Sequence, residues 1–155
     1  MTRSVSAWHL RRAQLEDAAE IARLVTELGY PVEAGAILPR LRALLVHPDH
    51  LVTVAAWPND RLSGVIMAEH RALLVYGSQV EIMGLSVGAD ARRMGVGRAL
   101  VKAVEDWARQ FGSNKIIVRS NVVRPESHPF YEKIGYERKK TQHVYARSLG
   151  KHACA

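Results

Sequence analysis

The sequence has little of what would place it in a membrane or in an oxidising compartment. Cys154 is the one cysteine among 155 residues, so no intrachain disulfide can form. The longest mainly apolar run, residues 51–57, is far shorter than the roughly 20 residues of a membrane helix. The opening stretch MTRSVSAWHLRR lacks the apolar core of a signal peptide. We therefore expect a cytoplasmic protein with no membrane partner.

Acidic residues are also in the minority, with 15 Asp and Glu against 22 Lys and Arg and a formal net charge of +7. Such an excess suits nucleic acid, an anionic membrane or an anionic cofactor. The basic residues are scattered, however, and gather only at residues 11–12, 92–93 and 138–140, without interleaved aromatic side chains. We expect no nucleic-acid partner. We also expect no metal, because His128 has no suitably spaced second ligand.

Apolar periodicity predicts an α/β (α+β) fold in a single domain over residues 1–148, followed by a flexible tail at 149–155. Pro39 should divide the second helix into two short pieces or kink it. Residues 72–78 should form a connection between two strands. The expected helices are 15–28, 33–45, 96–111 and 125–134, and the expected strands are 8–13, 51–57, 62–71, 80–87 and 115–120, with one or two more in 136–147.

The most informative stretch is a glycine-rich turn between the 80–87 strand and the 96–111 helix. A strand that leads through glycines into a helix N-terminus forms an anion site, because the first helical N–H groups are unpaired and the helix dipole favours negative charge. Alone, two glycines at such a turn are weak evidence of a ligand. The residues expected around the anion are Arg92, Arg93, Met94, Gly95, Val96, Gly97 and Arg98.

A second motif makes the signal specific. Residues 92–97 have the form Arg/Gln-x-x-Gly-x-Gly/Ala, and Phe130-Tyr131-Glu132-Lys133-Ile134-Gly135-Tyr136-Glu137 follows about thirty residues later. Together these motifs closely resemble the acetyl-CoA-binding motifs of the GNAT superfamily of N-acetyltransferases, and the likeness extends from residue 15 to about 145. The resemblance implies a mixed, mostly antiparallel sheet of about six to seven strands with helices on both faces. It also implies acetyl-CoA as co-substrate.

The resemblance assigns cofactor roles position by position. The strand residues Leu85, Ser86 and Val87 would pair with the pantetheine arm, the turn from Arg92 to Arg98 would hold the pyrophosphate, and Asn121 would have a cofactor or site-shaping role. Tyr131 corresponds to the tyrosine beside the thioester sulfur, which can protonate the departing thiolate. The family often forms dimers through its C-terminal strands, so a homodimer is expected.

Glu81 is an unusual charge in a predicted central strand. By alternation it should share a face with Met83, Leu85 and Val87. It precedes Arg92 by the offset at which histone-acetylating members of the family carry their general base. A carboxylate there could remove a proton from an attacking ammonium, directly or through water. The alternatives are a solvent-exposed strand end and a partner for substrate charge.

The acceptor is less constrained than the cofactor. In the family the loop around the first two helices overlies the acceptor pocket, so Glu27, Tyr30 and Glu33 are candidates for binding a cationic amine; Glu69 and His70 are second candidates for base or substrate contact. A small-molecule amine is expected, acetylated by direct attack in a ternary complex. A protein lysine or N-terminal acetyltransferase, and a non-catalytic acyl-CoA sensor, are the alternatives.

Overall fold

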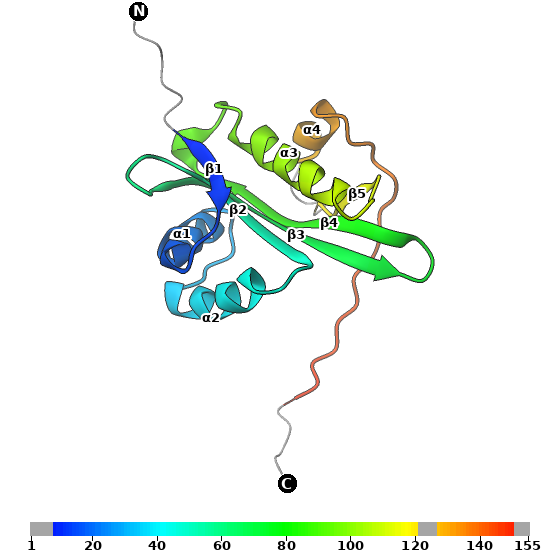
Figure 1. Ribbon diagram of the computed structural model, residues 1–155. Helices are drawn as coiled ribbons and strands as arrows, with labels where there is room; N and C mark the ends of the chain where they lie inside the picture. The colour runs from blue at the N-terminus through cyan, green and yellow to red at the C-terminus, as the bar shows by residue number, and fades with distance from the viewer. Residues whose placement is uncertain (1–7, 121–126, 151–155) are drawn as a thin grey trace, which may run out of the picture. The chain divides into compact units, whose positions relative to one another are not determined.

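The computed structural model describes residues 8–120 and 127–150. The chain divides into two compact units, Met1–Arg119 and Ser120–Ala155. The first unit contains one sheet of five strands whose order in space is their order in the chain, β1-β2-β3-β4-β5 (Figure 1). Neighbouring strands are antiparallel except β4 and β5, which are parallel. The strands are β1 His9–Arg12, β2 His50–Ala56, β3 Leu62–Leu73, β4 Gly77–Val87 and β5 Ile116–Val118.

The expected mixed, mostly antiparallel sheet is confirmed, but the strand count of six to seven is too high for the described residues. Residues 136–150 contain no strand, although 136–147 carry a strand-like pattern. A strand forms only where its N–H and C=O groups find a neighbouring strand. The predicted connection at 72–78 is also too long, because β3 and β4 pair up to Leu73 and Gly77, and Gly77 turns the chain with a φ of +72°.

Helices cover both faces of this sheet, with α1 and α2 on one side and α3 on the other (Figure 1). Short 3₁₀ turns, Leu15–Asp17 and Ala89–Ala91, precede α1 and α3. Pro39 lies inside α2, and the helix continues through it, so the expectation of two short pieces is wrong. A proline removes one helical hydrogen bond, whereas the buried side of α2 packs on both sides of it. The helices are α1 Ala18–Glu27, α2 Ala34–Leu45 and α3 Val96–Arg109.

The core beneath α1 and α2 is formed by small and branched side chains from both layers. Leu24 and Leu41, one from each helix, are buried against β2 and β3. Burying such side chains contributes about 1.5–3 kcal/mol each. The cluster comprises Ala13, Ile21, Leu24, Leu41, Val52, Val54, Ala56, Leu62 and Val65.

On the other face α3 lies very close to β3. A Cβ placed on Gly64 would be 2.8 Å from Val96 Cγ1 and 3.0 Å from Leu100 Cδ1. Val96 and Leu100 are both buried, and only a residue without a side chain leaves room for them. Gly64 therefore sets how closely the first turn of α3 approaches the sheet.

A β-bulge in β4 changes which side chains share a face. The pairing register shifts between Met67 and Ala68, so β4 has an extra residue at this point. Cross-strand partners point to the same face, and the partners are Glu81 with Glu69, Leu85 with Ile66, and Val87 with Gly64. The expectation that Glu81 shares a face with Leu85 and Val87 is therefore wrong, because alternation cannot continue through a bulge.

The described residues of the second unit contain one short helix, α4 Ser127–Lys133. It lies within the predicted helix at 125–134, whose first two residues are outside the described residues. Gly135, with a φ of +99°, ends the turn, and Tyr136 N donates to Tyr131 O at 2.9 Å. Of the expected tail at 149–155, only residues 149 and 150 are described.

Candidate active site

The glycine-rich turn is an open helix N-terminus, as its sequence indicates. Gly95 is the N-cap of α3 with a φ of +77°, and no side chain caps the helix. Arg93 also has a positive φ, of 63°. Ala99 N donates to Gly95 O, so the N–H groups before Ala99 precede the first helical bond. Uncapped amides at the positive end of a 14-residue helix form a site for an anion.

Three arginines surround this turn. Arg92, Arg93 and Arg98 are all exposed, and none of them forms an ion pair with another described residue. Met94, also at the turn, is 45% exposed. The turn therefore offers main-chain donors and cationic side chains to the same region of solvent, which is what a diphosphate requires.

The second half of β4 has no partner on its β5 side within the described residues. The parallel ladder covers only the pairs Val80–Ile116, Glu81–Ile117 and Ile82–Val118. Leu85 and Val87 lie beyond it and are half-buried. Ser86 is buried, and its Oγ donates to Leu24 O at 2.8 Å, so this side chain ties β4 to α1. The main chain around Leu85 and Val87 is thus the part of β4 that an extended ligand can pair with.

Glu81 is buried and lies between two arginines. Glu81 is only 4% exposed to solvent. Arg71 Nη2 is 3.0 Å from Glu81 Oε2, and Arg119 pairs with Oε1. Arg71 also reaches Glu69 Oε2 at 3.4 Å and Met83 Sδ at 3.9 Å. Glu81 Oε2 is a buried oxygen without a hydrogen bond from any described residue. The carboxylate is therefore paired with two positive charges, whereas its Oε2 accepts no hydrogen bond from the part of the chain that the structure describes.

The structure brings Glu69 to Glu81 and separates His70 from both. Glu69 and Glu81 are direct cross-strand partners, whereas His70 points to the opposite face as the next residue along β3. The His70 ring stacks on Phe111 at a centroid distance of 4.0 Å. Glu69 is thus placed with the candidate base, and His70 belongs to a different cluster.

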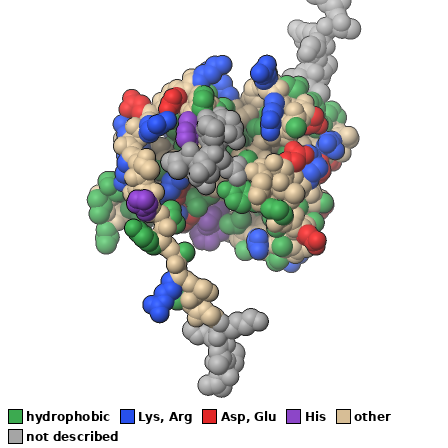
Figure 2. All heavy atoms as spheres, turned by 180° about the vertical axis from the view of Figure 1, so that it is seen from behind, with side chains coloured by type: hydrophobic (Ala, Val, Ile, Leu, Met, Phe, Trp, Pro, Cys, Tyr) green, Lys and Arg blue, Asp and Glu red, His purple; other side chains and the backbone are tan. Residues whose placement is uncertain are grey.

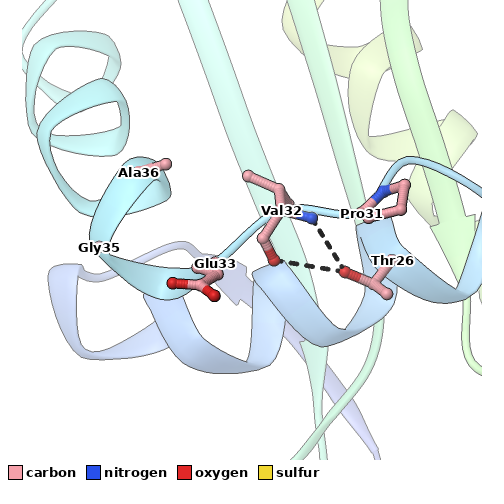
Figure 3. Close-up of a pocket in the computed structure, with 6 residues that line it drawn as sticks. All are labelled: Thr26, Pro31, Val32, Glu33, Gly35 and Ala36. Carbon is pink, nitrogen blue, oxygen red and sulfur yellow. Dashed lines mark hydrogen bonds between the residues drawn. The ribbon is translucent and has the colours of Figure 1, made fainter.

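The loop between α1 and α2 lines an open pocket of about 710 Å³ (Figure 3). Glu33 lies at this pocket, whose shape is maintained by two hydrogen bonds at 3.3 Å between Thr26 Oγ1 and the main chain of Val32. Glu27 pairs with Arg23 at 2.9 Å, and Tyr30 is 53% exposed. Of the three predicted acceptor contacts, Glu33 lines this pocket, and Glu27 and Tyr30 are not among its lining residues.

Tyr131 lies in α4 of the second unit. Its ring is near those of Phe130 and Tyr136, at centroid distances of 5.1 and 6.0 Å. Burial raises the pKa of the Tyr131 phenol above its ordinary value of 10.0. The phenol is therefore protonated at neutral pH, as a proton donor must be. Asn121, the other predicted residue of this region, lies outside the described residues.

On the face drawn in Figure 2, basic side chains are interspersed with acidic and hydrophobic ones rather than gathered into a stripe. Among the described helices, none has the length and apolar character to cross a bilayer. Nor do residues 8–120 and 127–150 contain a group of three His, Cys, Asp or Glu side chains placed to hold a metal ion.

The sheet is mostly antiparallel with a parallel last pair, and β4 leads through the glycine turn to the open N-terminus of α3. The chain belongs to the acetyltransferase (GNAT) family, whose model matches residues 15–136. The expected membership and enzyme class are thereby confirmed.

One sequence relative and two solved structures are similar to this chain over most of its length. The uncharacterized N-acetyltransferase YhdJ of Bacillus subtilis is 28% identical over 122 residues, which cover 78% of this chain and 85% of the relative. The crystal structure of aminoglycoside 6'-N-acetyltransferase AAC(6')-Ih from Acinetobacter baumannii matches with a TM-score of 0.80 at 20% identity, covering 92% of this chain and 99% of that one. The structure of aminoglycoside N-acetyltransferase AAC(6')-Iy in complex with CoA matches with a TM-score of 0.82 at 20% identity. The match covers 95% of this chain and 98% of that one.

Two residues of the Glu81 cluster were missed by sequence reasoning, Arg71 and Arg119. Arg71 follows Glu69 by two residues in a predicted strand, which places both on one face. That pattern indicates that Glu69 and Arg71 can pair. It does not indicate that Arg71 also reaches Glu81, because the β-bulge changes which residues of β3 and β4 lie opposite each other. Arg119 reaches Glu81 only because β5 lies parallel to β4.

Proposed function

We propose that the protein transfers an acetyl group from acetyl-CoA to a primary amine of a small molecule, by direct attack in a ternary complex. The observation that carries this proposal is the exposed, uncapped N-terminus of α3 with Arg92, Arg93 and Arg98 around it. The CoA diphosphate would bind the amides from Met94 to Arg98. The pantetheine arm would pair with the main chain at Leu85 and Val87.

In the proposed reaction the amine nitrogen attacks the thioester carbonyl carbon, and the carbon–sulfur bond breaks as the amide forms. Tyr131 donates its phenolic proton to the departing thiolate. Its burial supports this role, because a raised pKa keeps the proton on the oxygen until the thiolate forms. Main-chain N–H groups near Leu85 to Val87 would polarise the carbonyl.

For Glu81 the geometry favours an electrostatic role over that of general base. Two guanidinium groups stabilise the charged form of a carboxylate and thereby weaken it as a proton acceptor. If Glu81 is the base, its buried Oε2 must first become accessible to the amine or to water. We propose instead that Glu81 offsets the positive charge of Arg71 and Arg119 beside the acceptor and that water accepts the ammonium proton. A Glu81→Gln variant separates the two roles, since only loss of a base removes the alkaline-rising limb of the pH–rate profile.

The acceptor proposed is a cationic amine. Glu33 at the α1–α2 pocket and Glu69 beside Glu81 are acidic contacts for it. The similar structures named as aminoglycoside acetyltransferases support a small amine over a protein lysine or N-terminus. A homodimer in the cytoplasm is our proposal for its assembly and location, which gel filtration with light scattering and cell fractionation would test.

The deciding experiment is release of CoA thiol from acetyl-CoA in the presence of a panel of aminoglycosides, polyamines, amino acids and lysine peptides. We expect release that depends on a small amine, with mass spectrometry identifying the N-acetyl product. Binding of acetyl-CoA without amine-dependent release would instead support the sensor alternative. Release with lysine peptides alone would support a protein acetyltransferase.

A further inference from the structure

A second polar cluster lies on the α3 face of the sheet, apart from Glu81. His70 Nδ1 is 3.0 Å from Asp49 Oδ1, and His70 Nε2 is 2.7 Å from Ser78 Oγ. Ser78 Oγ is in turn 2.8 Å from Ser113 Oγ. A carboxylate, an imidazole and a hydroxyl thus form one chain. All its members lie within the first unit.

The imidazole of this cluster is firmly positioned. Its ring stacks on Phe111 with an interplanar angle of 10° and is largely buried, with 17% of the side chain exposed. His70 N also donates to Asp49 O at 2.8 Å. His70 and Asp49 are therefore joined by a main-chain hydrogen bond as well as by the side-chain one. A ring with these restraints presents Nε2 to Ser78 in one orientation.

The hydrogen-bond directions suit a base acting on a hydroxyl. Asp49 is a carboxylate and can only accept, so Nδ1 carries the proton and Nε2 is left to accept from the hydroxyl of Ser78. The hydrogen bond from His70 lowers the pKa of Asp49, which maintains its charge at neutral pH. Ser113, which is buried, can donate to Ser78 Oγ and leave the Ser78 proton directed at His70.

We propose that Ser78 is a nucleophilic hydroxyl that accepts an acetyl group from an activated acyl donor, with His70 as its base and Asp49 as the positioning residue. A nucleophile within hydrogen-bond reach of a base that a third group orients is the arrangement of activated hydroxyls on many folds. Ser78 is exposed at the start of β4, so a donor can reach it from solvent.

The step is an acyl transfer. Ser78 Oγ forms a bond to the carbonyl carbon of the donor while its proton passes to His70 Nε2. The bond from that carbon to the leaving oxygen or sulfur breaks, and the leaving group takes the proton from His70. The products are an O-acetyl ester on Ser78 and a free alcohol or thiol. The donor is an oxygen ester or a thioester such as acetyl-CoA.

The test uses the full chain incubated with p-nitrophenyl acetate in one arm and with acetyl-CoA in the other. Intact-mass measurement and peptide mapping follow the adduct over time. We expect one acetyl group on Ser78 in at least one arm, and the arm that labels identifies the donor. Ser148→Ala, at an exposed serine outside the cluster, is the matched control and should be labelled like the wild type. Ser78→Ala should lose the adduct while retaining amine-dependent thiol release.

Two further variants separate reactivity from structure. His70→Gln should slow labelling by about a hundredfold or more, the usual contribution of a general base. If His70→Gln does not fold, Asp49→Asn serves, since it removes the charge that orients the imidazole and should slow labelling with thermal unfolding unchanged. No adduct in either arm, an adduct mapped elsewhere, or equal rates in folded variants would overturn the proposal, whether or not the protein acetylates amines.

Discussion

A single methyl group added at Gly64 tests how the sheet positions the anion site. The Cβ of a Gly64→Ala variant would lie 2.8 Å from Val96 Cγ1, 3.0 Å from Leu100 Cδ1 and 3.1 Å from Ser86 O. The first of these is closer than packed carbon atoms approach, so the Val96 side chain must shift, and we expect α3 to move with it because a valine in a helix has one preferred rotamer. Because Val96 is the first residue of α3, the movement begins at the glycine turn itself.

The expected cost follows from overpacking of a buried site, about 1–3 kcal/mol in the free energy of unfolding. For a chain of this length each kcal/mol lowers the melting temperature by about 2–4 °C, so a decrease of about 2–12 °C is expected. The same displacement should raise the KM for acetyl-CoA, because the amides of the α3 N-terminus move from their positions.

Thermal unfolding by circular dichroism and initial-rate kinetics are the assays. Gly35→Ala is the matched control for stability, since its Cβ would meet nothing within 4 Å and it lies in α2, where alanine is the better helix former. Adding Val96→Ala to Gly64→Ala should recover stability relative to the sum of the single variants. Unchanged stability and KM in Gly64→Ala, or purely additive costs in the double variant, would refute the close-packing argument.

Three further predictions concern charge and proton transfer. Tyr131→Phe should lower kcat far more than it changes the Kd of acetyl-CoA. In the wild type the decrease of kcat on the alkaline side should follow the raised pKa of Tyr131, and unchanged turnover in the variant would exclude Tyr131 as the acid. Glu81→Gln should raise the KM of a cationic amine and leave the shape of the pH–rate profile unchanged, whereas a lost alkaline-rising limb would restore Glu81 as the base. Glu20→Gln should lose about 1–2 kcal/mol of stability at pH 7, because Glu20 binds Arg23 and accepts from Leu62 N at 2.9 Å. Arg23 lowers the pKa of Glu20 below 4.5, so this stabilisation is present above pH 4.5 and disappears as the pH falls through the lowered value, which denaturant unfolding at several pH values would measure.

The helices and the anion turn could be predicted because each depends on neighbours in the chain. The apolar spacing in α1 and α3 repeats at the helical period. Gly95 adopts the left-handed backbone conformation of the turn before α3, which glycine adopts readily. Whether residues 136–147 form strands could not be predicted in the same way. A strand-like pattern indicates only that a segment can pair, and pairing also requires the edge of a neighbouring strand.

The partners of Glu81 and the cluster around His70 also depend on pairing. The extra residue at the β4 bulge places Glu81 on the face of Glu69 instead of the face of Leu85 and Val87. The local sequence pattern does not predict this bulge. Asp49 and Ser113 lie far from His70 in sequence and reach its cluster only through the sheet register and the end of α3.

The sequence by itself determined the family, the α/β class and the glycine turn that would bind the CoA diphosphate, because these depend on short-range periodicity, glycine conformation and motif spacing. Only the tertiary structure decided what Glu81 contacts, where His70 points and how tightly α3 packs on Gly64. Those features depend on strand register and side-chain packing between segments far apart in the chain, and neither is specified by the residues on either side of the position concerned.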